Sequence, residues 1–411
     1  MSTPSSAASA LPAPEMRRVR PAFIALGALV GASLAIYLLV LLQAGLRHQD
    51  LDASLGAGRD LLAGRPLYDA FLNHPFPDAT LRPAYIYPPA FALLMAPLAM
   101  LPRGLAVAVW VILNQAALAG ALVMVLRVAR PGAWAAAALV AATATFYPLW
   151  IDVVQGQANL LVLLLLTAGL VGVLEGRQRW ATALGVAAGL KLTPALLLIW
   201  LLVERRFRAA AWMLSGFAAL TLAGALVRPQ DTLVFFTRVA PALAHGTAVY
   251  ANQSISGLVL RIGSVNPYTN PWGVLPWPTA LTLVLAILLG ACWWWQTRRD
   301  RAALRAAAFL PLLPLLSSVT WPHHLVLLLP LIWLAFAALG RSGWPAARTA
   351  TLVGLLLLFS VAFRLPVGPA FGKPGFRLAQ TTDPLVFLVA NTLLLGTLIL
   401  FMVGPWLLRD R

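Results

Sequence analysis

Long apolar runs are the feature that most limits what this 411-residue chain can fold into. A membrane-crossing helix needs about 20 predominantly apolar residues. Runs of about that length recur near residues 22–45, 104–126, 133–151, 157–174, 180–203, 209–227, 278–297, 303–320, 324–339, 346–363 and 384–408. Only 10% of the residues are charged, against about 25% in soluble domains. Because backbone groups in lipid must be paired within their own segment, we expect an all-α polytopic membrane protein.

The positive charge is spread in a way that excludes a nucleic-acid-binding surface. The formal charge of +17 comes from small basic clusters between apolar runs, such as Arg205-Arg206-Arg208 and Arg298-Arg299-Arg301-Arg305. Clusters of this kind are typical of the cytoplasmic loops of bacterial membrane proteins. We therefore predict a multi-pass protein of the bacterial inner membrane, with both termini in the cytoplasm and no nucleic-acid partner.

The domain organisation follows from the same runs. Residues 1–20 are expected to be a disordered cytoplasmic N-terminus, because most of them are Ser, Ala or Pro. Residues 21–411 are expected to form one transmembrane domain with large outer loops at 46–103 and 228–277. The apolar run 87–101 is short and contains three prolines, so we expect it to lie as an interfacial helix on the outer face.

The run 180–203 presents a conflict that predicts a broken helix. Basic clusters on both sides of it should be cytoplasmic, yet one straight span would place them on opposite sides. Two half-helices joined by a turn at Lys191–Pro194 would remove the conflict, and Pro194 disfavours continuous helix there. Such a break is tolerated only where protein or a polar cavity satisfies the freed backbone groups.

This threading places most unusual polar residues on the outer side. Asp50 follows the first apolar run and would lie at the lipid–water boundary, where its carboxylate could take a proton from an acceptor hydroxyl. A solvated loop carboxylate near Arg47 is the alternative. Lys191 is an ammonium group in an apolar stretch, which usually marks a functional pairing, and a lipid phosphate would suit it. Its alternatives are snorkelling or a structural bond to carbonyl groups.

Other outer polar residues suit phosphate or sugar contacts. His323 and His324 follow Pro322 at the start of a helix, where neighbouring side chains point about 100° apart and chelate poorly. No carboxylate motif accompanies them, so we expect no metal and no cofactor. The amides of Gln157, Asn159, Asn252 and Gln253 could bind sugar hydroxyls, or could cap helix ends.

Six stretches resemble glycosyltransferases of the GT-C class, family 87, and occur in the family's order. They are DLDASLGAGRDLLAGRPLYD (50–69), YIYPPAFALLMAPLAMLP (85–102), GQANLLVLLLL (156–166), GLKLTPALLL (189–198), NQSISGLVLR (252–261) and SSVTWPHHLVLLLP (317–330). The family includes polyprenyl-phosphate-mannose-dependent mannosyltransferases. Where the family has a Ser-Pro-x-Ser-Trp element, this chain has Ser-Ser-Val-Thr-Trp at 317–321, without the proline.

The resemblance implies a GT-C fold of about twelve membrane helices, two of them the half-helices of the hairpin, and an inverting transfer. Its donor would be a polyprenyl phosphate that carries mannose or another monosaccharide, and its acceptor a glycolipid or glycan on the outer face. Asp50 would be the general base, with Lys191, His323, His324 and Arg261 at the donor phosphate. A transporter or flippase of lipid-linked sugar is the alternative, since it too uses broken helices and intramembrane charge.

Overall fold

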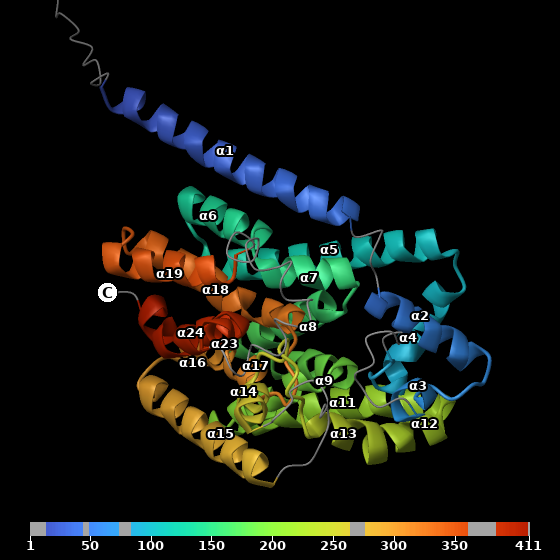
Figure 1. The fold of residues 1–411 in the computed structure, drawn as a ribbon. Coiled ribbons are helices and arrows are strands. Elements are labelled where there is room, and N and C mark those ends of the chain that lie inside the picture. Colours follow the sequence, from blue (N-terminus) through green and yellow to red (C-terminus); the bar gives the residue numbers. More distant parts are fainter. Residues whose placement is uncertain (1–13, 44–48, 74–83, 264–275, 361–383, 410–411) are drawn as a thin grey trace, which may run out of the picture.

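The computed structural model describes residues 14–43, 49–73, 84–263, 276–360 and 384–409 (Figure 1). Within these ranges the chain is helical, and its β-pairing is limited to an isolated bridge between Phe146 and Ser360. The helices of the first half are α1 (Pro14–Gln43), α2 (Gln49–Leu62), α3 (Asp69–Asn73), α4 (Pro89–Ala99), α5 (Arg103–Ala129), α6 (Ala133–Ala144), α7 (Tyr147–Gln155), α8 (Asn159–Leu174), η2 (Gln178–Trp180), α9 (Ala181–Leu190), η3 (Thr193–Leu196) and α10 (Leu197–Val203). Those of the second half are α11 (Phe207–Val227), α12 (Pro229–Val234), η4 (Phe235–Val239), α13 (Ala240–Ala244), α14 (Ile255–Gly263), α15 (Pro276–Thr297), α16 (Ala302–Phe309), α17 (Leu312–Leu316), η5 (Pro322–Leu328), α18 (Leu329–Arg341), α19 (Ala346–Leu358), α23 (Pro384–Ala390) and α24 (Thr392–Leu408).

The all-α membrane architecture is confirmed, whereas the number of membrane-crossing helices is not. Among the described residues, five helices are long and apolar enough to cross a bilayer: Phe23–Gln43, Arg103–Ala129, Phe207–Val227, Thr279–Thr297 and Pro322–Arg341. Six more helices in the same ranges are apolar but shorter, including the segment Pro89–Ala99 that was expected at the interface.

Several predicted spans are divided by breaks. The run 133–151 consists of α6 and α7, which separate at Phe146, where the chain pairs with Ser360 and the Tyr147 amide donates to the Phe359 carbonyl at 2.8 Å. The run 303–320 is likewise two short helices, α16 and α17. A 12-residue helix such as α6 rises only about 18 Å, against a hydrocarbon core of about 30 Å.

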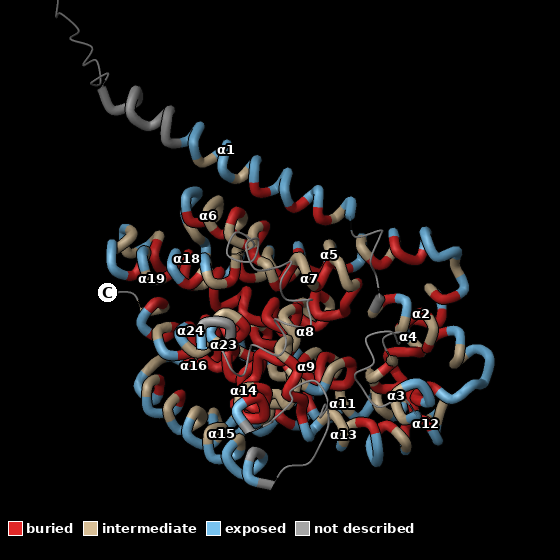
Figure 2. Tube along the Cα trace, viewed as in Figure 1, coloured by how far each residue is buried: buried red, intermediate tan, exposed pale blue. Residues whose placement is uncertain are grey.

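The most buried and the most exposed helices mark the core of the bundle and its lipid-facing periphery. The helical stretch Pro322–Arg341 is 89% buried along its most apolar window, and its second part, α18, packs against α5, α6 and α24. Buried residues gather in the middle of the bundle (Figure 2). In contrast, α1 and α15 run along opposite edges and expose apolar side chains such as Ile24 and Ile287. Exposed apolar faces on such helices suit contact with acyl chains. The helix α1 begins at Pro14, within the stretch 1–20 that was expected to be disordered, and residues 1–13 lie outside the described part.

The predicted reversal after residue 190 is present. Lys191 has extended backbone angles (φ −149°, ψ 122°) and ends α9. A Cβ at Gly185 would meet Met213 and Phe217, whereas one at Gly189 would meet Leu220, so α9 and α11 run in the same direction. The intervening α10 must therefore run back. Glycines four residues apart let the two parallel helices approach closely.

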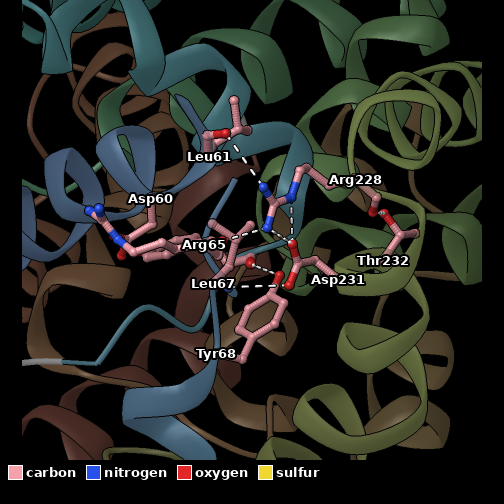
Figure 3. A network of polar contacts seen from close by, with 9 residues as sticks. Asp60, Leu61, Arg65, Leu67, Tyr68, Arg228, Asp231 and Thr232 are labelled. Atoms are coloured by element: carbon pink, nitrogen blue, oxygen red, sulfur yellow. Dashed lines mark hydrogen bonds and ion pairs between the residues drawn. The ribbon is translucent and has the colours of Figure 1, made fainter. Parts of the chain in front are cut away.

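Contacts between residues distant in sequence hold α2 against α4 and hold the chain that leaves α2 against the junction of α11 and α12. A Cβ at Gly58 of α2 would approach within 2.9 Å of Ala99 in α4. Asp231 accepts hydrogen bonds from Arg228 Nε at 2.6 Å and from the Leu67 amide at 3.2 Å, and Arg228 also donates to the Leu61 and Arg65 carbonyls (Figure 3). This network holds the chain leaving α2 against the start of α12.

Candidate active site

A cavity of about 230 Å³ forms where six separate segments meet. They are the first turn of α2, the stretch 84–88, the turn between α7 and α8, the tip of the α9–α10 hairpin, the helices η4 and α13, and the stretch 317–324 that leads into η5. The polar side chains that line it and that sequence analysis predicted are Asp50, Gln157, Lys191, His323 and His324, here called the cavity cluster. Apolar side chains, among them Ile86, Phe235 and Leu243, complete the wall.

Asp50 lies in the first turn of α2 and is held by an oriented amide. Gln157 Nε2 donates to Asp50 Oδ2 at 2.5 Å, and the Tyr87 hydroxyl donates to Gln157 Oε1 at 2.7 Å. Because a hydroxyl proton must go to the amide oxygen, this bond turns the amide nitrogen towards Asp50. Burial raises the pKa of Asp50, while the Gln157 hydrogen bond and the charge of Lys191 lower it. Asp50 accepts the hydrogen bond from Gln157 and donates none, so its ionised carboxylate is suited to accept a proton.

The turn that carries Gln157 depends on a glycine. Gly156 ends α7 with φ +68°, in the left-handed region that glycine enters without steric cost. Trp110 Nε1 donates to the Gly156 carbonyl at 2.8 Å and fixes the turn from α5. Gln157 and Asn159 are thereby presented from the turn and from the start of α8.

Lys191 projects from the break in the hairpin and is anchored through two buried groups. Its Nζ donates to Asn159 Oδ1 at 2.7 Å, and Asn159 Nδ2 donates to Asp152 Oδ1 at 2.7 Å. The ammonium also lies 5.4 Å from the centre of the Tyr87 ring. An ammonium has three donors, so a hydrogen bond to Asn159 leaves capacity for an anion in the cavity. Asn159 itself is fully buried and serves Lys191 and Asp152.

His323 and His324 also line the cavity. Both are buried, and their ring centres lie 4.7 Å apart at an angle of 68°. Neither ring nitrogen of His323 has a hydrogen-bond partner among the described residues, and the same holds for Nδ1 of His324. A buried polar atom without a partner is costly, so these nitrogens suit a ligand that enters the cavity. No group of three or more His, Cys, Asp or Glu residues in the described ranges is arranged to hold a metal ion.

The remaining predicted residues, Asn252, Gln253 and Arg261, lie elsewhere. Together with Asn391, which was not predicted, we call them the bracing cluster. Arg261 Nη1 donates to the Val249 and Asn252 carbonyls at 3.0 and 2.8 Å, and Nη2 donates to Asn391 Oδ1 at 2.5 Å. Its side chain is 1% exposed and does not line the cavity. The geometry therefore offers Arg261 no direct contact with a donor phosphate.

The side chains of Asn252 and Gln253 are likewise hydrogen-bonded to main-chain groups. Asn252 Nδ2 donates to the Thr247 and Ser318 carbonyls, and its Oδ1 accepts from the Thr320 amide at 2.8 Å. Gln253 Nε2 donates to the Tyr250 and Ala390 carbonyls. Neither amide lines the cavity, so the sugar contacts expected of them stay a prediction that this cavity does not support. They hold the segment 317–320, part of which does form the cavity wall.

Two residues of the site were not predicted as such. Tyr87 orients Gln157 and lies beside Lys191, and Asp152 anchors Asn159. A signal for Tyr87 exists in the stretch YIYPPAF, and Asp152 shares a polar segment with Gln157 and Asn159. Their roles depend on contacts between distant segments, which spacing along the chain does not reveal.

Comparison with known proteins identifies the family of this site. Residues 85–318 match the sequence profile of glycosyltransferase family 87. The chain is 33% identical, over 96% of its length and 90% of the relative's, to a polyprenol-phosphate-mannose-dependent alpha-(1-2)-phosphatidylinositol pentamannoside mannosyltransferase of Mycobacterium tuberculosis (strain CDC 1551 / Oshkosh). It is 29% identical, over 75% of each chain, to a polyprenol-phosphate-mannose-dependent alpha-(1-2)-phosphatidylinositol mannoside mannosyltransferase of Mycobacterium tuberculosis (strain ATCC 25618 / H37Rv).

A relative with a different named sugar also matches. An alpha-(1->3)-arabinofuranosyltransferase of Mycobacterium tuberculosis (strain CDC 1551 / Oshkosh) is 32% identical over 51% of this chain and 48% of its own length. No match is found among solved structures. Because the family profile covers more than half of the sequence and a relative covers nearly all of it, this chain belongs to glycosyltransferase family 87.

Proposed function

We propose that the protein is an inverting glycosyltransferase that moves a monosaccharide from a polyprenyl phosphate donor to a glycolipid or glycan acceptor. The names of its relatives favour mannose as the sugar and a phosphatidylinositol mannoside as the type of acceptor. The charge pattern supports a site on the outer face of the bacterial inner membrane. A GT-C fold with about twelve membrane helices remains part of this proposal.

One observation carries the proposal: a single cavity joins a buried carboxylate to a buried ammonium and two histidines without protein partners on several of their nitrogens. The donor phosphate would lie between Lys191 and the histidines. An ammonium is a suitable point cation for phosphate, and charge-assisted hydrogen bonds are the strongest available here. The apolar wall at Ile86, Phe235 and Leu243 would receive the first isoprene units of the lipid.

The reaction is a displacement at the anomeric carbon. The acceptor hydroxyl oxygen forms the new bond to that carbon, and its proton passes to a carboxylate oxygen of Asp50. The bond from the anomeric carbon to the phosphate oxygen breaks, and its electron pair leaves on the polyprenyl phosphate. Lys191 and the histidines stabilise the charge that grows on this leaving phosphate, which is where preorganised groups lower the barrier most. Attack opposite the leaving group inverts the anomeric centre.

Replacement of the base is the direct test. Asp50→Asn keeps the size of the side chain but cannot accept a proton near neutral pH. Removal of a general base typically costs 10²–10⁴-fold in rate, so transfer should fall by at least about a hundredfold. The measurement is transfer of labelled sugar from a polyprenyl phosphate donor to an extracted glycolipid acceptor by the purified protein. Donor binding should persist, because Asp50 faces the acceptor hydroxyl.

Asp52→Asn is the matched control, two residues further along α2. The Asp52 carboxylate is exposed and pairs with Arg103 at 2.8 Å, so its loss should change transfer by no more than a few-fold. Turnover near the wild-type rate in Asp50→Asn would refute the proposed mechanism. If the intact protein transfers no sugar from any polyprenyl phosphate donor but moves such a lipid across vesicles, it is a flippase instead.

A further inference from the structure

A small polar cavity lies beside the active-site cavity and shares Gln157 with it. We call it the α5–α7 cavity, because most of its lining comes from those two helices: Trp110, Val111, Asn114 and Gln115 of α5, Asp152 and Val153 of α7, and the turn residues Gly156 and Gln157. Its volume of about 10 Å³ matches the smallest space that can hold one water molecule. The proposed sugar transfer does not use this cavity.

Three side chains at the α5–α7 cavity each have one polar atom paired and another without a partner among the described residues. Asn114 Nδ2 donates to a main-chain carbonyl of α5 at 3.0 Å, whereas Asn114 Oδ1 is unpaired. Gln115 Oε1 accepts from the Tyr37 hydroxyl at 2.9 Å, whereas Gln115 Nε2 is unpaired. Asp152 Oδ1 accepts from Asn159 Nδ2 at 2.7 Å, whereas Asp152 Oδ2 is unpaired.

These unpaired atoms are shielded from bulk solvent. Asn114 is 5% exposed and Asp152 is 1% exposed. A buried polar atom without a hydrogen bond destabilises the fold, and internal water is the usual partner where the protein supplies none. Because three such atoms belong to residues that line one small cavity, a single molecule bound there could pair with all of them.

The chemistry of the three atoms matches water. Two of them, Asn114 Oδ1 and Asp152 Oδ2, are acceptors, and Gln115 Nε2 is a donor. A water molecule can donate to both oxygens while it accepts from the nitrogen, which gives the three hydrogen bonds typical of buried water. A metal ion would not suit this set, because the amide nitrogen of Gln115 would direct its hydrogens towards the cation.

We propose that one ordered water molecule binds in the α5–α7 cavity and that Asp152, held by this water, positions Lys191 through Asn159. Since Asn159 Nδ2 donates to Asp152 Oδ1, the Asn159 amide is oriented with its oxygen towards Lys191 Nζ, which donates to it at 2.7 Å. The water fixes the second oxygen of Asp152 in the same way. The importance of Lys191 for donor binding rests on the proposed function, whereas the water site does not.

With this water, hydrogen bonds form one chain from the periphery of the protein to the active site. Tyr37 of the peripheral helix α1 bonds to Gln115, the water joins Gln115 to Asp152, and Asn159 joins Asp152 to Lys191. A buried chain in which every member is paired holds each side chain in one orientation. Asp152 is therefore a positioning residue, which acts on the donor site through Asn159 and Lys191.

An experimental structure of the wild-type protein, at a resolution that shows water, tests the water site without any donor. One water molecule should lie within about 3.2 Å of Asn114 Oδ1, Gln115 Nε2 and Asp152 Oδ2. A dry cavity in which Asn114 or Gln115 bonds directly to Asp152 would overturn the water site. This test decides the question even if the protein transfers no sugar.

Substitution of Asp152 tests the positioning role. Asp152→Leu removes both acceptor oxygens at similar volume, so the Asn159 amide can turn and its bond to Lys191 is lost. Affinity for a fluorescent polyprenyl phosphate sugar should fall about tenfold or more. Asp152→Asn keeps an oxygen for Asn159 and should restore affinity to within about threefold of wild type. The control Thr167→Val removes another buried, unpaired oxygen, on α8 and away from the cavity, and should leave affinity unchanged.

The pattern of losses distinguishes this inference from the proposed function. Wild-type affinity in folded Asp152→Leu protein, alongside a large loss in Lys191→Met, would overturn the positioning role and leave the donor site standing. Equal losses in Asp152→Leu and Asp152→Asn would show that the carboxylate itself, and not the orientation of Asn159, supports Lys191, which also overturns it. Should Asp152→Leu fail to fold, Asn114→Leu, which displaces the water, should lower affinity about threefold, and unchanged affinity would contradict the role of the water. Normal donor binding by Lys191→Met would instead refute the proposed donor site.

Discussion

The cavity cluster and the bracing cluster contain similar residues but use them in opposite ways. In the bracing cluster, both terminal nitrogens of Arg261 donate to protein, to two carbonyls and to Asn391, and only its Nε has no partner among the described residues. The amides of Asn252 and Gln253 are bonded to main chain. In the cavity cluster, by contrast, neither ring nitrogen of His323 has a partner within the part of the chain that the structure describes. Lys191 is held from one side by Asn159.

We propose that this difference separates residues that hold the structure around the site from residues that bind a ligand. A buried polar atom is normally hydrogen-bonded, and its partner is either another group of the protein or a ligand that binds there. Where protein supplies the acceptors, as for Arg261, loss of the side chain should reduce stability. Where acceptors are missing, as around Lys191 and His323, loss of the side chain should reduce ligand affinity.

The largest loss of donor affinity is expected from substitution of Lys191. Lys191→Met removes the cation while keeping a flexible apolar stem. Truncating one partner of a buried charge pair costs 2–5 kcal/mol or more, so donor affinity should fall at least about thirtyfold. The measurement is equilibrium binding of a fluorescent polyprenyl phosphate sugar. Lys191→Arg, which keeps the charge, should restore part of the affinity, and wild-type binding by Lys191→Met would place the phosphate elsewhere.

For the bracing cluster we expect the reverse, a loss of stability with donor binding retained. Arg261→Met leaves the carbonyls of Val249 and Asn252 and the Asn391 amide oxygen without their donor, at about 1–3 kcal/mol for each group. The unfolding temperature in detergent should therefore drop by several degrees, while the folded fraction binds donor within about threefold of wild type. Arg238→Met, at an exposed arginine, is the control and should not change the unfolding temperature. A stable Arg261→Met protein that no longer binds donor would erase the distinction between the clusters.

The smallest effect is expected at the hydroxyl that orients Gln157. Tyr87→Phe frees the amide to rotate, which weakens the Gln157 bond that lowers the pKa of Asp50. Asp50 acts as a base only when ionised, so activity is lost as pH falls through its pKa. A higher pKa should move the acid limb of the kcat/KM profile to higher pH, with a loss of only a few-fold on the plateau.

Tyr85→Phe provides the comparison for that shift. The Tyr85 hydroxyl also lies at the cavity but donates to the Pro88 carbonyl at 2.7 Å, away from Gln157. The Tyr85→Phe variant should therefore leave the acid limb of the kcat/KM profile at the same pH. Equal shifts in both variants would mean that burial in general, and not the oriented amide, sets the pKa of Asp50.

The same comparison shows how far sequence alone could go. The break at Lys191 was predictable, because basic clusters on both sides of one run and a proline at 194 allow few other paths. The cavity cluster was also predictable from polar residues at the ends of apolar runs. The role of Arg261 was not, because its partner Asn391 lies 130 positions away and the same motif would suit a phosphate. The division of run 133–151 depends likewise on the distant Phe359 carbonyl.

An experimental structure of the Asp50→Asn protein with a polyprenyl phosphate sugar bound tests the cavity cluster most directly, since this variant should bind donor without consuming it. The phosphate should lie within about 3 Å of Lys191 Nζ and of a ring nitrogen of His323 or His324. The anomeric carbon should lie between that phosphate and residue 50, with the lipid along Ile86, Phe235 and Leu243. A phosphate held by Arg261, or a donor bound outside this cavity, would show that the cavity cluster is not the donor site.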